Sequence, residues 1–275
     1  MTMAPFSRSR APASPVEALV ARHRLRAVEL LPWVLAIPAF WLYDDYLPLG
    51  SEILLTVLFA LSLDLILGYA GIVTLGHAAF FGLGAYTAGI LAANGWGEPI
   101  SGLVAAGAAA GVVGYATGRI ILRAHGLTLL MMTLVIVLAL NEGANRMGWL
   151  TGGADGLSGI TMWPIFGHFR FDLYGRTGYV YALAVLFVAW VFARRIVHSP
   201  FGRSLTGIRE NVTRMHAIGV PVRDRQVTIY AIAAVLAGVA GGLLAQTTQS
   251  VALTVMTFER SGAILIMLVL GGVGR

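Results

Sequence analysis

Residues 62–91 combine one carboxyl group, one imidazole and several glycines in a stretch that is otherwise apolar enough to cross a membrane. Asp64 lies within an apolar run, and His77 directly follows Gly76. The glycines are Gly68, Gly71, Gly76, Gly82, Gly84 and Gly89. An ionisable group at bilayer depth costs about 2.5–3.5 kcal/mol on insertion scales, and glycine costs about 1 kcal/mol relative to alanine inside a helix. The segment therefore predicts a helix with a buried polar group, a break near Ala70 to Gly76, and a second helix whose small residues allow close packing.

The remaining ionisable residues give little indication of catalysis. His77 fits a structural hydrogen bond better than a ligand role, because one histidine makes no metal site. The other histidines are scattered and show no HExxH spacing. His, Asp and Glu do not cluster at one membrane face, which disfavours a membrane enzyme. The sequence thus predicts neither a catalytic site nor a metal site.

Composition indicates a membrane protein with many spans. Of the 275 residues, 57% are hydrophobic and only 12% are charged, against about 25% charged residues in a typical soluble domain. All 19 basic residues are arginines, so the chain encodes neither a Walker A lysine nor a Schiff-base lysine. It has no cysteine and hence no thiolate chemistry. An engine that hydrolyses ATP must therefore be a separate chain, and no cofactor is expected in this one.

Apolar runs predict an all-α bundle of about eight transmembrane helices, since a span needs about 20 residues. The predicted spans are 28–43, 51–70, 76–93, 100–120, 126–142, 178–193, 226–247 and 258–273. Residues 1–27 are rich in arginine and proline, which predicts a disordered cytoplasmic arm, with a transit peptide as the weaker alternative. Residues 28–275 then form one membrane domain. Glycines at helix-packing spacing in the fourth and seventh of these spans predict close helix contacts.

Arginines gather at the ends of apolar runs, which fits the positive-inside rule better than binding of nucleic acid. With a cytoplasmic N-terminus, eight spans place the loop 198–225 inside and the loop 143–177 outside. Arg119, Arg123, Arg194 and Arg195 then lie inside, and Asp44, Asp45 and Glu98 lie outside.

The loop 198–225 carries helix signals of its own. Ser199 can cap a helix that has Pro200 at its first position. Asn211 can cap a second, shorter helix, and Gly219 suits the left-handed position that follows a helix. The loop therefore predicts a compact helical hairpin that serves as a cytoplasmic docking element.

Four blocks of sequence together resemble the branched-chain amino acid ABC transporter permeases of the LivM type. The blocks are LGYAGIVTLGHAAFFGLGAYTAGIL, TGGADGLSGI, FGRSLTGIRENVTRMHAIGV and AIAAVLAGVAGGLLA, in this order. The resemblance implies a permease subunit of an importer in the bacterial inner membrane. It also implies a periplasmic binding protein, a second permease of the LivH type and two cytoplasmic ATPases as partners.

The resemblance also assigns candidate site residues. The segment 201–220 is similar to the coupling segment of importer permeases, with Arg209, Glu210, Ala217 and Gly219 at the matching positions. The core membrane signature implies a substrate pathway along Asp64, Gly68, Gly71, Gly76, His77 and Phe80. From the residues alone, Asp64 either lines such a pathway or joins two helices.

The chain departs from the family pattern at several positions. Family members usually have asparagine where this chain has Asp64, and glutamine is common where it has Ile72. The sequence stops at LGGVGR where the family normally continues, so a shortened variant or a fragment is expected. Import of urea, short amides or aromatic acids is the alternative within the class. A self-sufficient secondary transporter or channel that uses Asp64 is the alternative from another class.

Overall fold

A computed structural model describes residues 46–165, 167–169, 171 and 175–274, together with isolated positions between 33 and 41. The chain divides into two units, Met1–Leu42 and Tyr43–Arg275, and the second unit contains the helical bundle. The predicted arm 1–27 and the pair Asp44 and Asp45 lie outside the described residues. The same holds for most of the predicted span 28–43.

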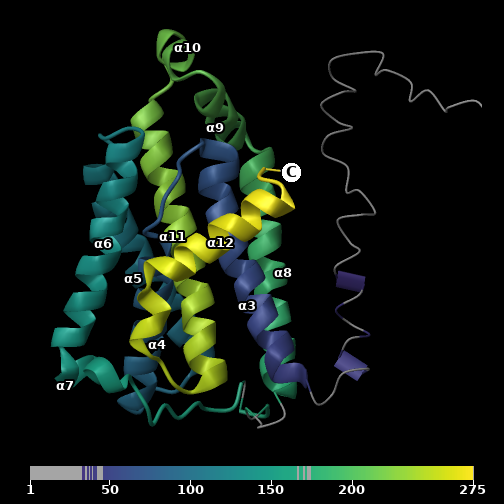
Figure 1. Ribbon diagram of the computed structural model, residues 1–275. Helices are drawn as coiled ribbons and strands as arrows, with labels where there is room; N and C mark the ends of the chain where they lie inside the picture. The colour runs from purple at the N-terminus through teal and green to yellow at the C-terminus, as the bar shows by residue number, and fades with distance from the viewer. Residues whose placement is uncertain are drawn as a thin grey trace, which may run out of the picture. The chain divides into compact units, whose positions relative to one another are not determined.

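The described residues of the second unit fold as helices joined by turns and loops, with two isolated β-bridges, Leu157 to Val251 and Ile165 to Phe169. This confirms the all-α bundle, and seven of the predicted spans coincide with helices (Figure 1). These helices are α3 (Leu47–Asp64, continued by the π-helix η2, Leu65–Tyr69), α4 (His77–Ala93), α5 (Pro99–Ile121), α6 (Leu127–Arg146), α8 (Arg176–His198), α11 (Val222–Thr248) and α12 (Phe258–Gly271).

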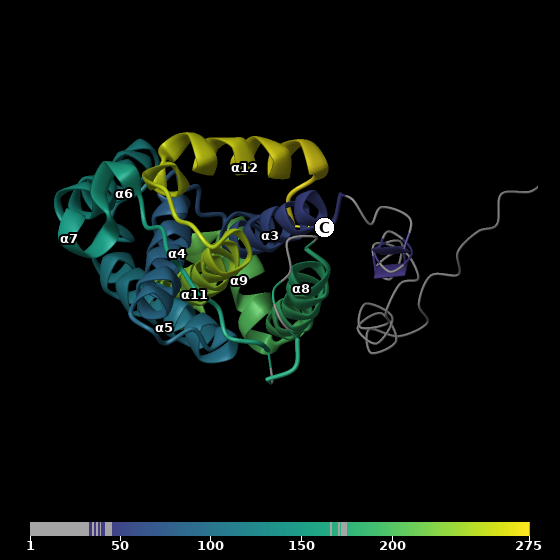
Figure 2. The ribbon, with the colours of Figure 1, turned by 90° about the horizontal axis from the view of Figure 1, so that it is seen from below.

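Five of these helices are long and apolar enough to cross a membrane, namely α3 with η2, α5, α6, α8 and α11. Helix α4 has 17 residues and α12 has 14, fewer than the about 20 that a span needs. Helix α4 is short because residues 71–76 approach it as non-helical chain. Helix α12 runs obliquely across one side of the bundle, next to α3 (Figures 1 and 2).

Helix α11 occupies the centre of the bundle, with α4 and α5 packed against it (Figure 2). Glycines permit this close approach. A Cβ atom at Gly241 would lie 1.7 Å from the Phe81 carbonyl oxygen, and one at Gly238 would lie 2.4 Å from the Ala110 Cβ. On α5, Gly111 and Gly114 pack against α11 in the same way. The predicted small-residue packing of these two spans is confirmed, since backbones approach this closely only where side chains are absent.

The helices alternate in direction and leave two ends with different loops (Figure 1). The turn between α5 and α6 lies at the same end as the segment 198–225. The turn between α4 and α5 lies at the opposite end, together with the described residues of the loop 147–175. The arginine-rich ends of α5 and α8 therefore share a side with the predicted docking loop, as the charge pattern predicts. Which side is cytoplasmic stays a prediction.

Candidate functional site

The helix break predicted near Ala70 to Gly76 is confirmed. Helix α3 ends in the π-helix η2, and Gly71 then adopts a φ of +68°, a left-handed value that favours glycine. Residues 71–76 continue as non-helical chain into the bundle, where Leu75 N–H donates to Thr133 Oγ1 at 3.2 Å. Thr133 is fully buried on α6. A protein hydroxyl thus satisfies backbone at a depth where lipid supplies no partner.

Asp64 lies beside Arg209, so a residue predicted for the pathway meets one predicted for coupling. Arg209 Nη1 donates a hydrogen bond to the Gly68 carbonyl oxygen. The same guanidinium attracts the Asp64 carboxylate, which accepts a 2.8 Å hydrogen bond from Gly274 N–H. A Cβ atom at Gly71 would lie only 3.0 Å from Arg209 Cγ. The end of α3 and the segment 198–225 are therefore in direct contact.

His77 and Phe80 are fully buried in an aromatic cluster. The His77 ring stacks on Phe59 with ring centroids 5.4 Å apart, and its Nε2 lies 2.8 Å from Ser62 Oγ. The Phe80 ring meets Tyr230 edge-on at 5.5 Å. These contacts place both side chains in the packing between α3, α4 and α11.

Gly76 also lies at a tight contact, because a Cβ atom there would come 2.3 Å from the Thr133 carbonyl oxygen. The structure thus separates the predicted pathway residues into two groups. Asp64, Gly68 and Gly71 are near the end that carries the segment 198–225, whereas Gly76, His77 and Phe80 lie in the core. Their role as a pathway stays a prediction.

The segment 198–225 forms the predicted helical hairpin. The Ser199 hydroxyl accepts from Gly202 N–H at 3.2 Å and caps α9 (Pro200–Glu210). The Asn211 side chain accepts from Arg214 N–H at 2.8 Å and caps α10 (Val212–Ala217). Gly219 follows with a φ of +82°. The local capping signals therefore determine this hairpin, as the sequence predicts.

The two helices of the hairpin differ in burial. Helix α9 buries Leu205 and Ile208 against the bundle, whereas no residue of α10 is buried. Ile218, just after α10, is 68% exposed. Of the four predicted coupling residues, Glu210, Ala217 and Gly219 are exposed at this projecting tip, and Arg209 reaches back to η2. Figure 1 shows α10 projecting beyond the membrane helices.

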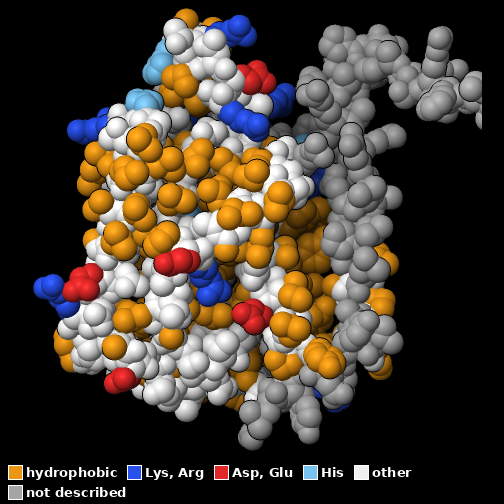
Figure 3. Space-filling model, viewed as in Figure 1, with side chains coloured by type: hydrophobic (Ala, Val, Ile, Leu, Met, Phe, Trp, Pro, Cys, Tyr) orange, Lys and Arg blue, Asp and Glu red, His pale blue; other side chains and the backbone are white. Residues whose placement is uncertain are grey.

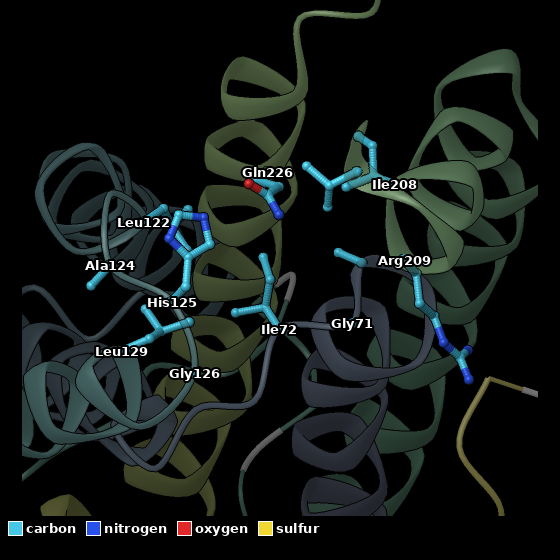
Figure 4. Close-up of a pocket in the computed structure, with 12 residues that line it drawn as sticks. Gly71, Ile72, Leu122, Ala124, His125, Gly126, Leu129, Ile208, Arg209 and Gln226 are labelled. Carbon is cyan, nitrogen blue, oxygen red and sulfur yellow. The ribbon is translucent and has the colours of Figure 1, made fainter. Parts of the chain in front are cut away.

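A cavity of about 190 Å³ separates the hairpin from the α5–α6 turn. The lining residues come from the helix break, the α5–α6 turn, the hairpin and the start of α11. They are Ala70, Gly71, Ile72, Leu122, Ala124, His125, Gly126, Leu129, Ile208, Arg209, Val212 and Gln226. Figure 4 shows the His125 and Gln226 side chains at this cavity, with the guanidinium of Arg209 turned away from it. The cavity leaves the hairpin partly free of the bundle, while Arg209 remains bonded to η2.

Sequence reasoning missed three charged residues on α3 and α12. Arg260 lies over the Phe81 ring, 4.4 Å from its centroid, and Glu52 attracts it electrostatically. Glu259 is exposed on the next position of α12. All three fall just inside the starts of the predicted spans 51–70 and 258–273. Their position inside predicted spans is the signal that could have identified them, because charged residues are rare in membrane helices.

A bundle of apolar helices with a broken helix and a projecting, capped hairpin is typical of a multi-pass membrane protein. Residues 50–275 match the family described as "Branched-chain amino acid transport system / permease component". Because this match covers most of the chain, the chain belongs to that family.

Curated relatives support the same assignment. The chain is 28% identical to the high-affinity branched-chain amino acid transport system permease protein LivM of Escherichia coli K12, over 94% of this chain and 66% of that protein. The Salmonella typhimurium protein of the same name is 27% identical over the same shares. A probable LivM permease of Methanocaldococcus jannaschii is 28% identical over 54% of this chain and 42% of that protein. The chain spans just under two thirds of the first two relatives, and no solved structure matches it.

Proposed function

We propose that this chain is the permease subunit of an ABC importer that carries branched-chain amino acids across the bacterial inner membrane. The observation that carries the mechanism is the hydrogen bond from Arg209 to the Gly68 carbonyl, which ties the hairpin to the broken helix. Family membership and the two LivM relatives support the substrate class. ATP is used by separate subunits, because the chain has no lysine for a Walker A motif.

The hairpin supplies a docking surface for the cytoplasmic ATPases. Its tip presents apolar Ile218 and Val212, which are 68% and 42% exposed, beside the charged Glu210 and Arg214. An apolar knob with a charged rim suits insertion into a groove of a partner, where the apolar centre is buried and the charges set the orientation. In this proposal the N-terminus and the hairpin are both cytoplasmic.

Movement of the hairpin then passes to the helix break. Closure of the two ATPases displaces α10 and α9 together, and Arg209 transmits the displacement to η2 through Gly68. Residues 71–76 carry few helical constraints, so they absorb a change in backbone angles as a hinge does. Helix α4 follows, because it begins directly after this segment. Alternating access results from this shift.

The remaining partners follow from the importer class. A periplasmic binding protein delivers the substrate to the end that carries the loop 147–175. A second permease of the LivH type pairs with this chain, and exposed apolar residues such as Val104 and Val135 face lipid or that partner.

Reconstitution tests the proposal. The protein is placed in liposomes with a second permease, two ATPases and a binding protein of the same importer class. We expect ATP-dependent uptake of radiolabelled leucine. Uptake of urea, short amides or aromatic acids in place of leucine would reassign the substrate. Leucine uptake that persists without the ATPases would favour a self-sufficient transporter.

The docking surface has its own test in the same liposomes. We expect Glu210→Arg and Gly219→Leu to abolish the coupling of ATP hydrolysis to uptake, while membrane insertion is retained. Gly143→Leu is the control, since Gly143 is a helical glycine with open space around it, away from the hairpin. Normal coupled uptake in both hairpin variants would contradict the docking role.

A further inference from the structure

The face formed by α3 and α12 carries charged side chains among apolar ones. Glu52 on α3 and Glu259 on α12 are exposed, and Arg260 is half-buried. Elsewhere on α12, Ile266 and Leu270 are 61% and 83% exposed. Figure 3 shows acidic and basic side chains together on this otherwise apolar face. A face that met only lipid would lack such charges, because they are expensive in hydrocarbon.

The contacts of Arg260 place it near the middle of the bundle. Its partner Phe81 lies twelve residues before the end of α4 at Ala93, which corresponds to about 18 Å along a helix axis. The hydrocarbon core is about 30 Å thick. The neighbouring Ser261 hydroxyl accepts a 2.8 Å hydrogen bond from Ala78 N–H, still deeper along α4. With Ala93 placed at the membrane surface, this distance puts Arg260 about halfway across the hydrocarbon core.

Arg260 is oriented but not neutralised. The Phe81 ring holds one face of its guanidinium at 4.4 Å. Among the described residues, no ion pair includes Arg260. Glu52 is near enough to attract Arg260 without contacting it. The guanidinium fork thus keeps donors free to bind a carboxylate in bidentate geometry.

We propose that Arg260 and Glu52 form a transient binding site for an α-amino acid zwitterion halfway along the translocation path. The inference rests on the proposed importer function and extends it by naming the residues that hold the substrate. Arg260 receives the carboxylate of the amino acid, and Glu52 receives its ammonium group. A zwitterion that enters between them compensates both charges, which neither residue achieves alone. The exposed apolar residues of α3, such as Ile53 and Val57, suit a branched aliphatic side chain.

A different role for the same residues is a tether that joins α3 to α12. A tether stabilises the fold and leaves transport unaffected once the protein is assembled. A transient binding site has the opposite signature, because uptake falls while assembly and thermal stability are retained. The two roles therefore give different results when uptake and unfolding are measured on the same variants.

The test uses the reconstituted importer, supplied with saturating leucine-loaded binding protein so that affinity upstream is constant. Arg260→Met keeps the packing on Phe81 and removes the charge, Arg260→Lys keeps the charge and removes the fork, and Glu52→Gln removes the second charge. The control is Arg119→Met, because Arg119 also lies over an aromatic ring, Tyr115 at 5.2 Å, near the end of α5.

We expect Arg260→Met and Glu52→Gln to lower leucine uptake at least about tenfold, the loss expected when one charge-assisted contact to substrate is removed. Arg260→Lys retains an intermediate rate, because a single ammonium binds carboxylate without the bidentate geometry. ATP hydrolysis and the thermal midpoint stay near wild type, as does uptake by Arg119→Met.

Two outcomes would overturn the inference. One is uptake within about twofold of wild type in Arg260→Met. The other is a loss of uptake that parallels a loss of thermal stability in every variant, which would identify a tether. Both leave the importer function intact if the wild-type complex transports leucine, whereas failure of the wild-type complex would overturn the importer function first.

Discussion

The guanidinium of Arg209 donates a hydrogen bond to the carbonyl oxygen of Gly68, although the two residues are 141 positions apart in the chain. Gly68 lies in η2, the π-helix that precedes the break, and Arg209 lies at the end of α9. This contact joins the projecting hairpin to the part of the bundle that departs from regular helix. In the mechanism proposed above, this contact passes movement of the hairpin to the membrane helices.

Loss of this contact is expected to uncouple the importer. Arg209→Met keeps the side-chain stem against Gly71 and removes the hydrogen bond. A hydrogen bond from a charged group contributes about 1.5–3 kcal/mol, so we expect several-fold more ATP hydrolysed per leucine imported. The measurement is the ratio of phosphate released to leucine taken up. Arg203→Met on the same helix is the control, since Arg203 is exposed. An unchanged ratio in Arg209→Met would exclude a transmitting role for this contact.

Local signals in the sequence were enough to predict much of this structure. The caps at Ser199 and Asn211 act within three residues, and the break at Gly71 is marked by glycine itself, so a single sequence reveals them. The inward turn of Arg209 depends on the packing of α9 against η2, which no local pattern encodes. Arg260 was missed for a similar reason. Its depth depends on the return of residues 249–257 into the bundle, which apolar periodicity does not reveal.

His77 and Ser62 form a buried pair that is expected to behave as one unit. The Ser62 hydroxyl donates to the Phe59 carbonyl oxygen at 2.6 Å, so His77 must donate its Nε2 proton to Ser62 Oγ. Ser62→Ala leaves that buried N–H without a partner, and we expect a loss of about 1–3 kcal/mol in unfolding free energy.

The double variant Ser62→Ala with His77→Phe provides the decisive comparison for this pair. It removes both polar groups and keeps a ring against Phe59, so we expect most of the lost stability to return. Thermal unfolding in detergent measures Ser62→Ala, the single variant His77→Phe and the double variant. Additive losses in the double variant would show that the two residues act independently. A double variant that folds well yet fails to transport would instead support a pathway role for His77.

Glu98 caps α5 and is expected to make its stability depend on pH. Its carboxylate accepts from the backbone N–H groups of Ser101 at 2.5 Å and Ile100 at 3.3 Å. Hydrogen bonding from Ser101 holds the pKa of Glu98 below its usual value of 4.5. A lowered pKa in the folded state means that the stabilisation is complete above pH 4.5 and is lost as the pH falls through the folded pKa.

The measurement for Glu98 is the thermal midpoint between pH 3 and pH 7. Glu98→Gln keeps an oxygen that can cap the helix but has no titrating proton. We therefore expect its thermal midpoint to fall less steeply at acidic pH, and to be slightly lower than that of wild type at neutral pH. Glu98→Ala removes the cap, which costs about 0.5–2 kcal/mol at neutral pH for helix caps in general. If the thermal midpoint falls equally at acidic pH in wild type and Glu98→Gln, other carboxylates determine the acid sensitivity.

Asp64 is expected to tolerate asparagine. Its carboxylate accepts a hydrogen bond from Gly274 N–H at 2.8 Å, and an asparagine side-chain oxygen can accept the same bond. The attraction to Arg209 is lost in Asp64→Asn, but the bond from Arg209 to Gly68 remains. We therefore expect uptake within about twofold of wild type, because one screened attraction contributes about 1 kcal/mol or less. Asp64→Leu removes the acceptor as well, and we expect it to lower the thermal midpoint. If Asp64→Asn instead abolishes uptake or changes the range of amino acids carried while the protein remains stable, the carboxylate acts on the substrate, and the pathway extends to this end of α3.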